Sequence, residues 1–223
     1  AIIPGRFVDH THADAVVTIS NTENGEARIR ELYGDRVMIV PYVMPGFVLA
    51  RAIYERSTGI RWEDLDGIVL LNHGVFTWGE TARESYERMI ELVNRAEDDL
   101  ARRQATATLP VPEDTAPELL GIARLRKTIS SLRGGAVLAR LDRSPEARAF
   151  TLLPNLADVT SRGPRTPDHV IRTKRTPLFV DETNDGGASA YADAYRGYFD
   201  RNTDGTLTCL DPAPRWAVWP GQG

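Results

Sequence analysis

The stretch Phe7-Val8-Asp9-His10-Thr11-His12-Ala13-Asp14 places two histidines one residue apart, directly before the apolar run Ala15-Val16-Val17-Thr18-Ile19. The chain of 223 residues contains only four histidines, so half of them lie in this stretch. In an extended segment, side chains at positions i and i+2 project to the same side. The pair therefore has the spacing that two ligands of one metal ion need, although a His-x-His pair alone is a weak signal.

His73 is the natural candidate for a third ligand. It ends the apolar segment Asp66-Gly67-Ile68-Val69-Leu70-Leu71-Asn72-His73, which we predict to be a buried strand. Gly74 follows at once and would let the backbone pass close to a neighbouring group. In open α/β sheets, sites gather at the carboxyl ends of strands. Catalytic zinc sites use three protein ligands and leave a position open, so the spacing predicts that His10, His12 and His73 converge on one ion.

Strand-like and helix-like segments alternate through the first hundred residues, which indicates an α/β layered fold with a core sheet flanked by helices. The residues Thr77-x-x-Glu80 resemble a capping box in front of a long amphipathic helix. Strands are expected at 13–20, 36–40 and 66–73, and helices at 27–33, 45–56 and from about residue 80 to 103.

The composition of the sequence changes after Arg103, where a polar segment with two prolines begins. We expect residues 1–103 to form a partial metal-binding core, residues 104–116 a linker, and residues 117–223 a smaller α+β unit. In that unit, helices are expected at 117–132 and 187–200, and strands at 137–141 and 170–174.

Composition excludes several classes of protein. The net charge of −4 argues against nucleic-acid binding, which normally accompanies a basic excess. No apolar run approaches the ~20 residues of a membrane span. The single cysteine, Cys209, cannot form an internal disulfide, and we expect a reducing, cytoplasmic setting. The chain lacks an initiating methionine and ends abruptly, so we expect a fragment that is truncated at its N-terminus and at its C-terminus.

A basic segment within the expected C-terminal unit offers a second, weaker candidate site. If residues 170–174 form a strand, Arg172 and Lys174 share a face and could meet an anion. A solvated basic strand with one satisfied histidine, His169, is the more common explanation of such a pattern. The final Gly-x-Gly at 221–223 is too short a motif to indicate a dinucleotide site.

Several motifs together resemble the class II aldolase/adducin family. They are His10-Thr11-His12, Leu71-Asn72-His73-Gly74, VPYVMPG (40–46) and NHGVFTWGETARESYERMIELVNRAED (72–98). The chain is most similar to the aldolase region of bacterial proteins that fuse an aldolase to a short-chain dehydrogenase, of the rhamnulose-1-phosphate aldolase/alcohol dehydrogenase type. GPRTPDHVIRTKR (163–175) is similar to the same narrower group.

The resemblance implies a metal-dependent lyase that cleaves a ketose phosphate into dihydroxyacetone phosphate and an aldehyde. It implies a homo-oligomer, and Zn²⁺ or another divalent metal held by His10, His12 and His73. Asp9 and Asp14 are candidates to orient the imidazoles from behind. In the family, the acid/base glutamate lies upstream of the His-x-His pair, in a region with no counterpart among the nine residues before His10. No catalytic acid/base residue is therefore assigned.

Two other functions are compatible with the same residues. One is a non-catalytic scaffold or assembly module, as in adducin heads. The other is a zinc-dependent sugar-phosphate dehydratase or epimerase, which needs the same metal with different proton transfers.

Overall fold

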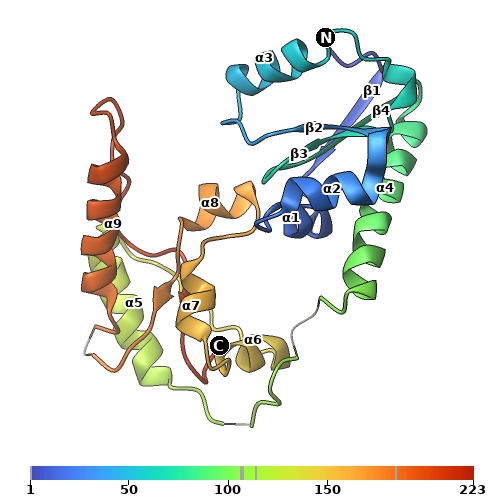
Figure 1. Ribbon diagram of the computed structural model, residues 1–223. Coiled ribbons are helices and arrows are strands. Elements are labelled where there is room, and N and C mark those ends of the chain that lie inside the picture. The colour runs from blue at the N-terminus through green and yellow to red at the C-terminus, as the bar shows by residue number, and fades with distance from the viewer. Residues whose placement is uncertain (1, 106–107, 114, 184) are drawn as a thin grey trace. The chain divides into compact units, whose positions relative to one another are not determined.

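The computed structural model describes residues 2–105, 108–113, 115–183 and 185–223. The chain has an α/β fold and divides into two compact units (Figure 1). Unit 1 comprises residues 1–107 together with residues 165–168, and unit 2 comprises residues 108–164 and 169–223. The two units have nearly the same length. Their sheets differ in size, with four strands in unit 1 and two strands in unit 2.

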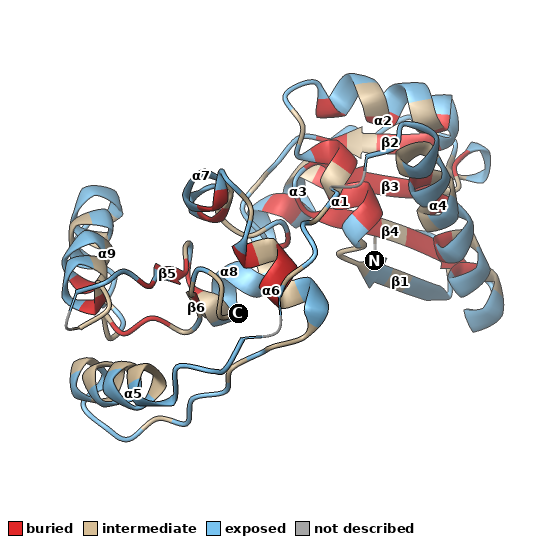
Figure 2. Ribbon diagram, turned by 90° about the horizontal axis from the view of Figure 1, so that it is seen from below, coloured by how far each residue is buried: buried red, intermediate tan, exposed pale blue. Residues whose placement is uncertain are grey.

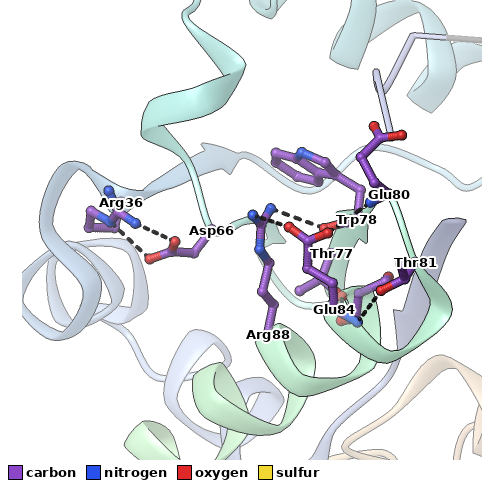
Figure 3. A network of polar contacts seen from close by, with 9 residues as sticks. Arg36, Asp66, Thr77, Trp78, Glu80, Thr81, Glu84 and Arg88 are labelled. Carbon is purple, nitrogen blue, oxygen red and sulfur yellow. Dashed lines mark hydrogen bonds and ion pairs between the residues drawn. The ribbon is translucent and has the colours of Figure 1, made fainter. Parts of the chain in front are cut away.

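Unit 1 is built on a four-stranded sheet in the order β1-β4-β3-β2. Strand β1 (Phe7–Thr11) pairs antiparallel with β4 (Gly74–Gly79), which pairs antiparallel with β3 (Gly67–Leu70). Strand β2 (Val37–Val40) runs parallel to β3. Two hydrogen bonds from Arg36 to the Asp66 carboxylate, visible in Figure 3, join the segments that lead into β2 and β3.

Alternation along the strands gives the sheet two apolar faces. Val37, Val69 and Val75 belong to one hydrophobic cluster, whereas Met38, Ile68 and Leu70 belong to another. This follows from the period of two in an extended chain, where successive side chains point to opposite faces. Figure 2 shows the burial of β3 and β4, in contrast to the largely exposed edge strand β1.

Helices cover both faces of this sheet. Helices α1 (Asp14–Ser20), α2 (Gly25–Tyr33) and α4 (Ala82–Arg102) contribute to the first cluster, and α3 (Phe47–Arg56) contributes to the second. Two short 3₁₀ turns, η1 (Gly34–Arg36) and η2 (Trp62–Asp64), precede β2 and β3. The expected strands at 36–40 and 66–73 and the helices at 27–33 and 45–56 are confirmed within a few residues at their ends.

The prediction of a strand at 13–20 is wrong, because these residues form helix α1. A short apolar run has no periodicity that distinguishes a buried strand from a buried helix. Most of α1 is buried, including Val16 and Val17, and it packs against α4. Tertiary packing therefore outweighs the strand preference of its β-branched residues.

The capping box also lies one turn further along than the sequence suggests. Thr77 is a buried residue of β4, a strand that the sequence analysis missed, and its hydroxyl donates to the Ser85 carbonyl at 2.8 Å. The N-cap of α4 is Thr81, whose hydroxyl oxygen accepts from the Glu84 amide at 3.1 Å (Figure 3). The Glu84 carboxylate reaches back and accepts from the Glu80 amide at 2.9 Å.

Unit 2 consists mainly of helices around a two-stranded parallel sheet. A third hydrophobic cluster forms its core, with Leu178, Val180 and Ala188 buried. Its elements are α5 (Leu119–Arg133), α6 (Pro145–Thr151), α7 (Leu156–Ser161), α8 (Pro167–Thr173), β5 (Leu178–Phe179), α9 (Ala188–Asn202) and β6 (Ala217–Val218). The first two residues of α8 belong to unit 1.

Helices α5 and α9 confirm the two helices expected in the C-terminal unit. The two expected strands are wrong: residues 137–141 have no regular secondary structure, and residues 170–173 lie in α8. None of the helices in the described ranges has the length and apolar character that crossing a bilayer requires.

Replacing the cap of α4 tests this reading of the helix start. Thr81→Ala should destabilise the protein by about 1 kcal/mol, because the first turn of α4 loses its side-chain acceptor. Thr81→Ser keeps a hydroxyl and serves as the matched control. Thermal or urea denaturation would measure both, and an unchanged stability of the alanine variant would contradict the assigned cap.

Candidate metal centre

His10 lies in β1, directly opposite Phe76 of β4. The two rings stack, with their centroids 4.1 Å apart and an interplanar angle of 17°. The Nδ1 atom of His10 lies 2.9 Å from the carbonyl oxygen of Val75. A carbonyl oxygen only accepts, so Nδ1 carries the proton and the lone pair of Nε2 is left available.

His12 follows one residue after the end of β1. Its Nδ1 atom lies 2.6 Å from a carboxylate oxygen of Asp168, and its Nε2 atom lies 3.0 Å from Nε2 of His10. An ionised carboxylate is also only an acceptor, so the proton of His12 is on Nδ1. Both rings therefore turn the lone pair of Nε2 toward the same point.

His73 is brought to this point by the tight connection between β3 and β4. Asn72 has a φ of 59°, a left-handed conformation that asparagine tolerates better than most residues. Its side-chain amide donates to the Asn21 side-chain oxygen at 2.9 Å, and its backbone amide lies 3.2 Å from the Ser20 hydroxyl. Helix α1 and the residue after it thus hold the turn that places His73.

The three imidazoles form a compact group. Each offers one ring nitrogen, and these nitrogens all lie within 4.8 Å of one another. The ring centroid of His73 lies 5.2 Å from that of His10 and 4.9 Å from that of His12. The structure therefore brings together the three histidines that the sequence analysis selected, from β1, from the residue after it and from the β3–β4 connection.

Gly74 permits this close approach, as its place after His73 suggested. A Cβ atom at this position would lie 2.3 Å from the carbonyl oxygen of Thr11, 3.0 Å from Cδ2 of His12 and 3.2 Å from Cε1 of His10. The first of these distances is to backbone, which cannot yield easily. Glycine is therefore required here by space, not by a left-handed φ angle.

The local electrostatics keep two of the imidazoles neutral at pH 7. Burial of the ring is the main reason why the pKa of His73 falls to about 4, and the nearby His10 and His12 lower it further. The His10 ring stacks on Phe76, and this burial lowers its pKa as well, while the hydrogen bond to Val75 acts in the opposite direction. Neutral imidazole is the form that ligates metal ions.

A divalent cation fits this arrangement. Two lone pairs that face each other across 3.0 Å repel unless a positive charge lies near both. A tetrahedral zinc ion with nitrogen ligands at about 2.0–2.1 Å would separate those ligands by roughly 3.3 Å. Nδ1 of His73 is buried and has no hydrogen-bond partner among the residues that the structure describes. This ring nitrogen is therefore available to a ligand.

The sequence analysis missed the residue that orients His12. Neither Asp9 nor Asp14 accepts a hydrogen bond from the three imidazoles within the described part of the chain, and Asp14 instead pairs with Arg165 at 2.7 Å. Asp168 takes the role at His12, and a backbone carbonyl takes it at His10. Asp168 lies 156 residues away from His12, so no local pattern could have linked the two.

The two residues proposed for an anion site belong to unit 2, whereas the three imidazoles belong to unit 1. Because residues 170–173 are helical, Arg172 and Lys174 do not share a strand face. Arg172 is exposed, whereas Lys174 is buried, donates to the Asp211 carbonyl and lies 3.7 Å from the centroid of the Tyr195 ring. Burial lowers the pKa of Lys174 to about 8. Anion binding by this pair stays a prediction.

Two family models match the chain. The class II aldolase and adducin N-terminal domain matches residues 4–100, and the aldolase class II second domain matches residues 116–223. The chain belongs to the class II aldolase/adducin family. The imidazole group lies within the N-terminal match, and Asp168 lies within the second one.

This class II aldolase/adducin chain is 30% identical over 243 residues to a protein named uncharacterized oxidoreductase YuxG, from Bacillus subtilis (strain 168). The match covers 100% of the chain but 35% of YuxG, so the chain spans about a third of the length of this curated relative.

Two solved structures are similar to part of the chain. The N-terminal class II aldolase domain of a conserved protein from Thermoplasma acidophilum is 39% identical, covers 44% of each chain and has a TM-score of 0.39. An aldolase II superfamily protein from Pseudomonas syringae is 20% identical, covers 44% of this chain and 40% of its own, and has a TM-score of 0.35.

Substitution of Gly74 tests the packing of the candidate centre. Gly74→Ala should weaken Zn²⁺ binding at least tenfold, because the added Cβ would push the Thr11 backbone and the two imidazoles apart. Gly135→Ala is the matched control, since a Cβ at Gly135 meets no atom within 4 Å. Competition with a chromophoric chelator measures both variants, and equal affinities would show that the spacing around Gly74 does not limit the site.

Proposed function

We propose that this chain is the metal-binding aldolase part of a lyase that cleaves a ketose phosphate into dihydroxyacetone phosphate and an aldehyde. The observation that supports it best is the convergence of three imidazoles, two of which hold their protons outward and turn their Nε2 lone pairs inward. Membership of the class II aldolase/adducin family supports the reaction class.

His10, His12 and His73 would hold the ion, with Zn²⁺ as the expected metal because imidazole nitrogen suits it. When bound, the zinc ion supplies a Lewis acid that stabilises the negative charge left on the ketone fragment as the carbon–carbon bond breaks. Neutral imidazole ligands do not cancel the charge of the ion that they hold. The Val75 carbonyl and the Asp168 carboxylate keep the His10 and His12 rings in the required orientation.

The cleavage also needs a group that moves a proton on the substrate. No aspartate or glutamate joins the imidazole group in the described part of the chain, and the Asp168 oxygen nearest to it is bonded to the back of His12. We therefore assign the acid/base residue to another segment of the parent protein, outside these 223 residues.

The length of YuxG and the oxidoreductase in its name support a longer parent protein in which a dehydrogenase region accompanies the aldolase part. A scaffold without catalysis would not need three converging imidazoles, two of them oriented by hydrogen bonds. A zinc-dependent dehydratase or epimerase would use the same set, so only the products of the reaction distinguish it from an aldolase.

Loss of one ligand tests the metal. His12→Ala should lower the zinc content of the purified chain from about one ion to well below one, and in the parent protein it should abolish carbon–carbon cleavage, with the fold kept. His169→Ala replaces the fourth histidine and controls for unspecific binding to imidazole. Elemental analysis and circular dichroism measure content and fold, and equal zinc content in wild type and His12→Ala would refute the assignment.

The origin of the acid/base group can be tested with the chain itself. The 223-residue chain loaded with zinc should turn over a panel of ketose 1-phosphates about 10²–10⁴-fold more slowly than the parent protein, because it lacks general acid–base catalysis. A coupled assay for dihydroxyacetone phosphate compares the two proteins. Similar rates would place the acid/base residue within these 223 residues.

A further inference from the structure

Residues 165–168 follow the linker in sequence but belong to unit 1. Arg165 attaches this segment to α1 at two points: its guanidinium pairs with Asp14 at 2.7 Å and donates to the Thr18 hydroxyl at 3.2 Å. The Asn21 side chain, just after α1, donates to the Arg165 carbonyl at 3.0 Å. Three separate contacts thus hold one residue against the helix that follows the His-x-His pair.

Three residues further on, Asp168 reaches the back of His12 at 2.6 Å. Both ends of the segment therefore contact residues 12–21, Arg165 through α1 and Asp168 through the imidazole. Asn21 contributes to both sides of the site, because it also accepts from the Asn72 amide that holds the turn before His73.

His12 needs such an external partner more than the other two histidines do. His10 is held within the sheet by Phe76 and by the Val75 carbonyl, and His73 is buried in the tight β3–β4 connection. His12 lies after the last paired residue of β1, where the ladder with β4 has ended. The hydrogen bond made by one ring nitrogen decides which tautomer a histidine adopts. Among the described residues, the only such bond that His12 makes outside the imidazole group is the one that it donates to Asp168.

We propose that residues 165–168 form a clamp that positions His12, with Arg165 as its anchor and Asp168 as the group that fixes the Nδ1–H tautomer and the ring orientation. The inference rests on the proposed metal-binding function. It assigns to Asp168 and Arg165 a positioning role: neither would be a ligand of the ion, and both would raise the affinity of the site through His12. A segment beyond the linker thereby sets how tightly the N-terminal domain holds its metal.

The clamp can be tested in the full chain with Asp168→Ala, Asp168→Asn, Arg165→Ala and, as a matched control, Arg162→Ala. Arg162 is the exposed C-cap residue of α7, and among the described residues its guanidinium pairs only with Asp158 of that helix. Two quantities are measured: Zn²⁺ affinity by chelator competition, and the imidazole tautomers of the metal-free protein by ¹⁵N–¹H NMR.

Asp168→Ala should weaken zinc binding about 10–100-fold, as removal of a ligand's hydrogen-bond partner does elsewhere. In the metal-free protein, the His12 ring should lose its single Nδ1–H tautomer while His10 keeps its own. Asp168→Asn retains an acceptor oxygen and should keep the tautomer with a smaller loss of affinity. Arg165→Ala should shift both quantities in the direction of Asp168→Ala, and Arg162→Ala should change neither.

The outcomes separate the clamp from the metal function. If the wild-type chain binds no zinc, the proposed function fails, and the metal-free tautomer of His12 still decides whether Asp168 orients it. If the wild type binds zinc but Asp168→Ala binds it equally well, or retains the His12 tautomer, the clamp is refuted. If Asp168→Ala does not fold, Asp168→Asn and Arg165→Ala provide the same comparison.

Discussion

The antiparallel pairing of β1 with β4 is the contact on which the candidate site depends. Its register sets His10 opposite Phe76 and places the Val75 carbonyl within hydrogen-bonding distance of the His10 ring. The strand period is two, so a slip of one residue would move His10 to the other face of the sheet. The same ladder ends at Thr11 opposite Val75, which leaves His12 next to the start of β4 and hence next to His73.

The pairing of β1 with β4 requires very close packing around Gly74. Thr11, His10 and His12 all lie against Gly74, where a single additional carbon would collide with backbone. The left-handed Asn72 then has to turn the chain within the short connection, and Ser20 and Asn21 hold it there. Helix α1 thus serves the site although it offers no ligand, because its C-terminal end holds the turn and Asp14 and Thr18 hold Arg165.

Local patterns predicted the parts of the fold that depend on local periodicity. The amphipathic helices could be recognised because their side-chain spacing requires one buried face. Strands β2 and β3 could be recognised as short, continuous apolar runs, which fit strands that are buried on both faces. Helix α1 could not be recognised, since its short apolar run fits a strand equally well and its packing against α4 decides the matter. Strand β4 was missed because the Thr77 hydroxyl suggests a helix cap in sequence, whereas in the fold it satisfies the Ser85 carbonyl.

The sequence by itself determined which three histidines are candidate ligands and that a glycine lies beside them. Two histidines are spaced along an extended segment and a third ends an apolar strand, and both patterns are local. Only the tertiary structure decided what orients them. A hydrogen bond joins atoms that are close in space whatever their separation along the chain, so the Val75 carbonyl and the Asp168 carboxylate became visible as partners only after β1 had paired with β4 and residues 165–168 had packed on α1.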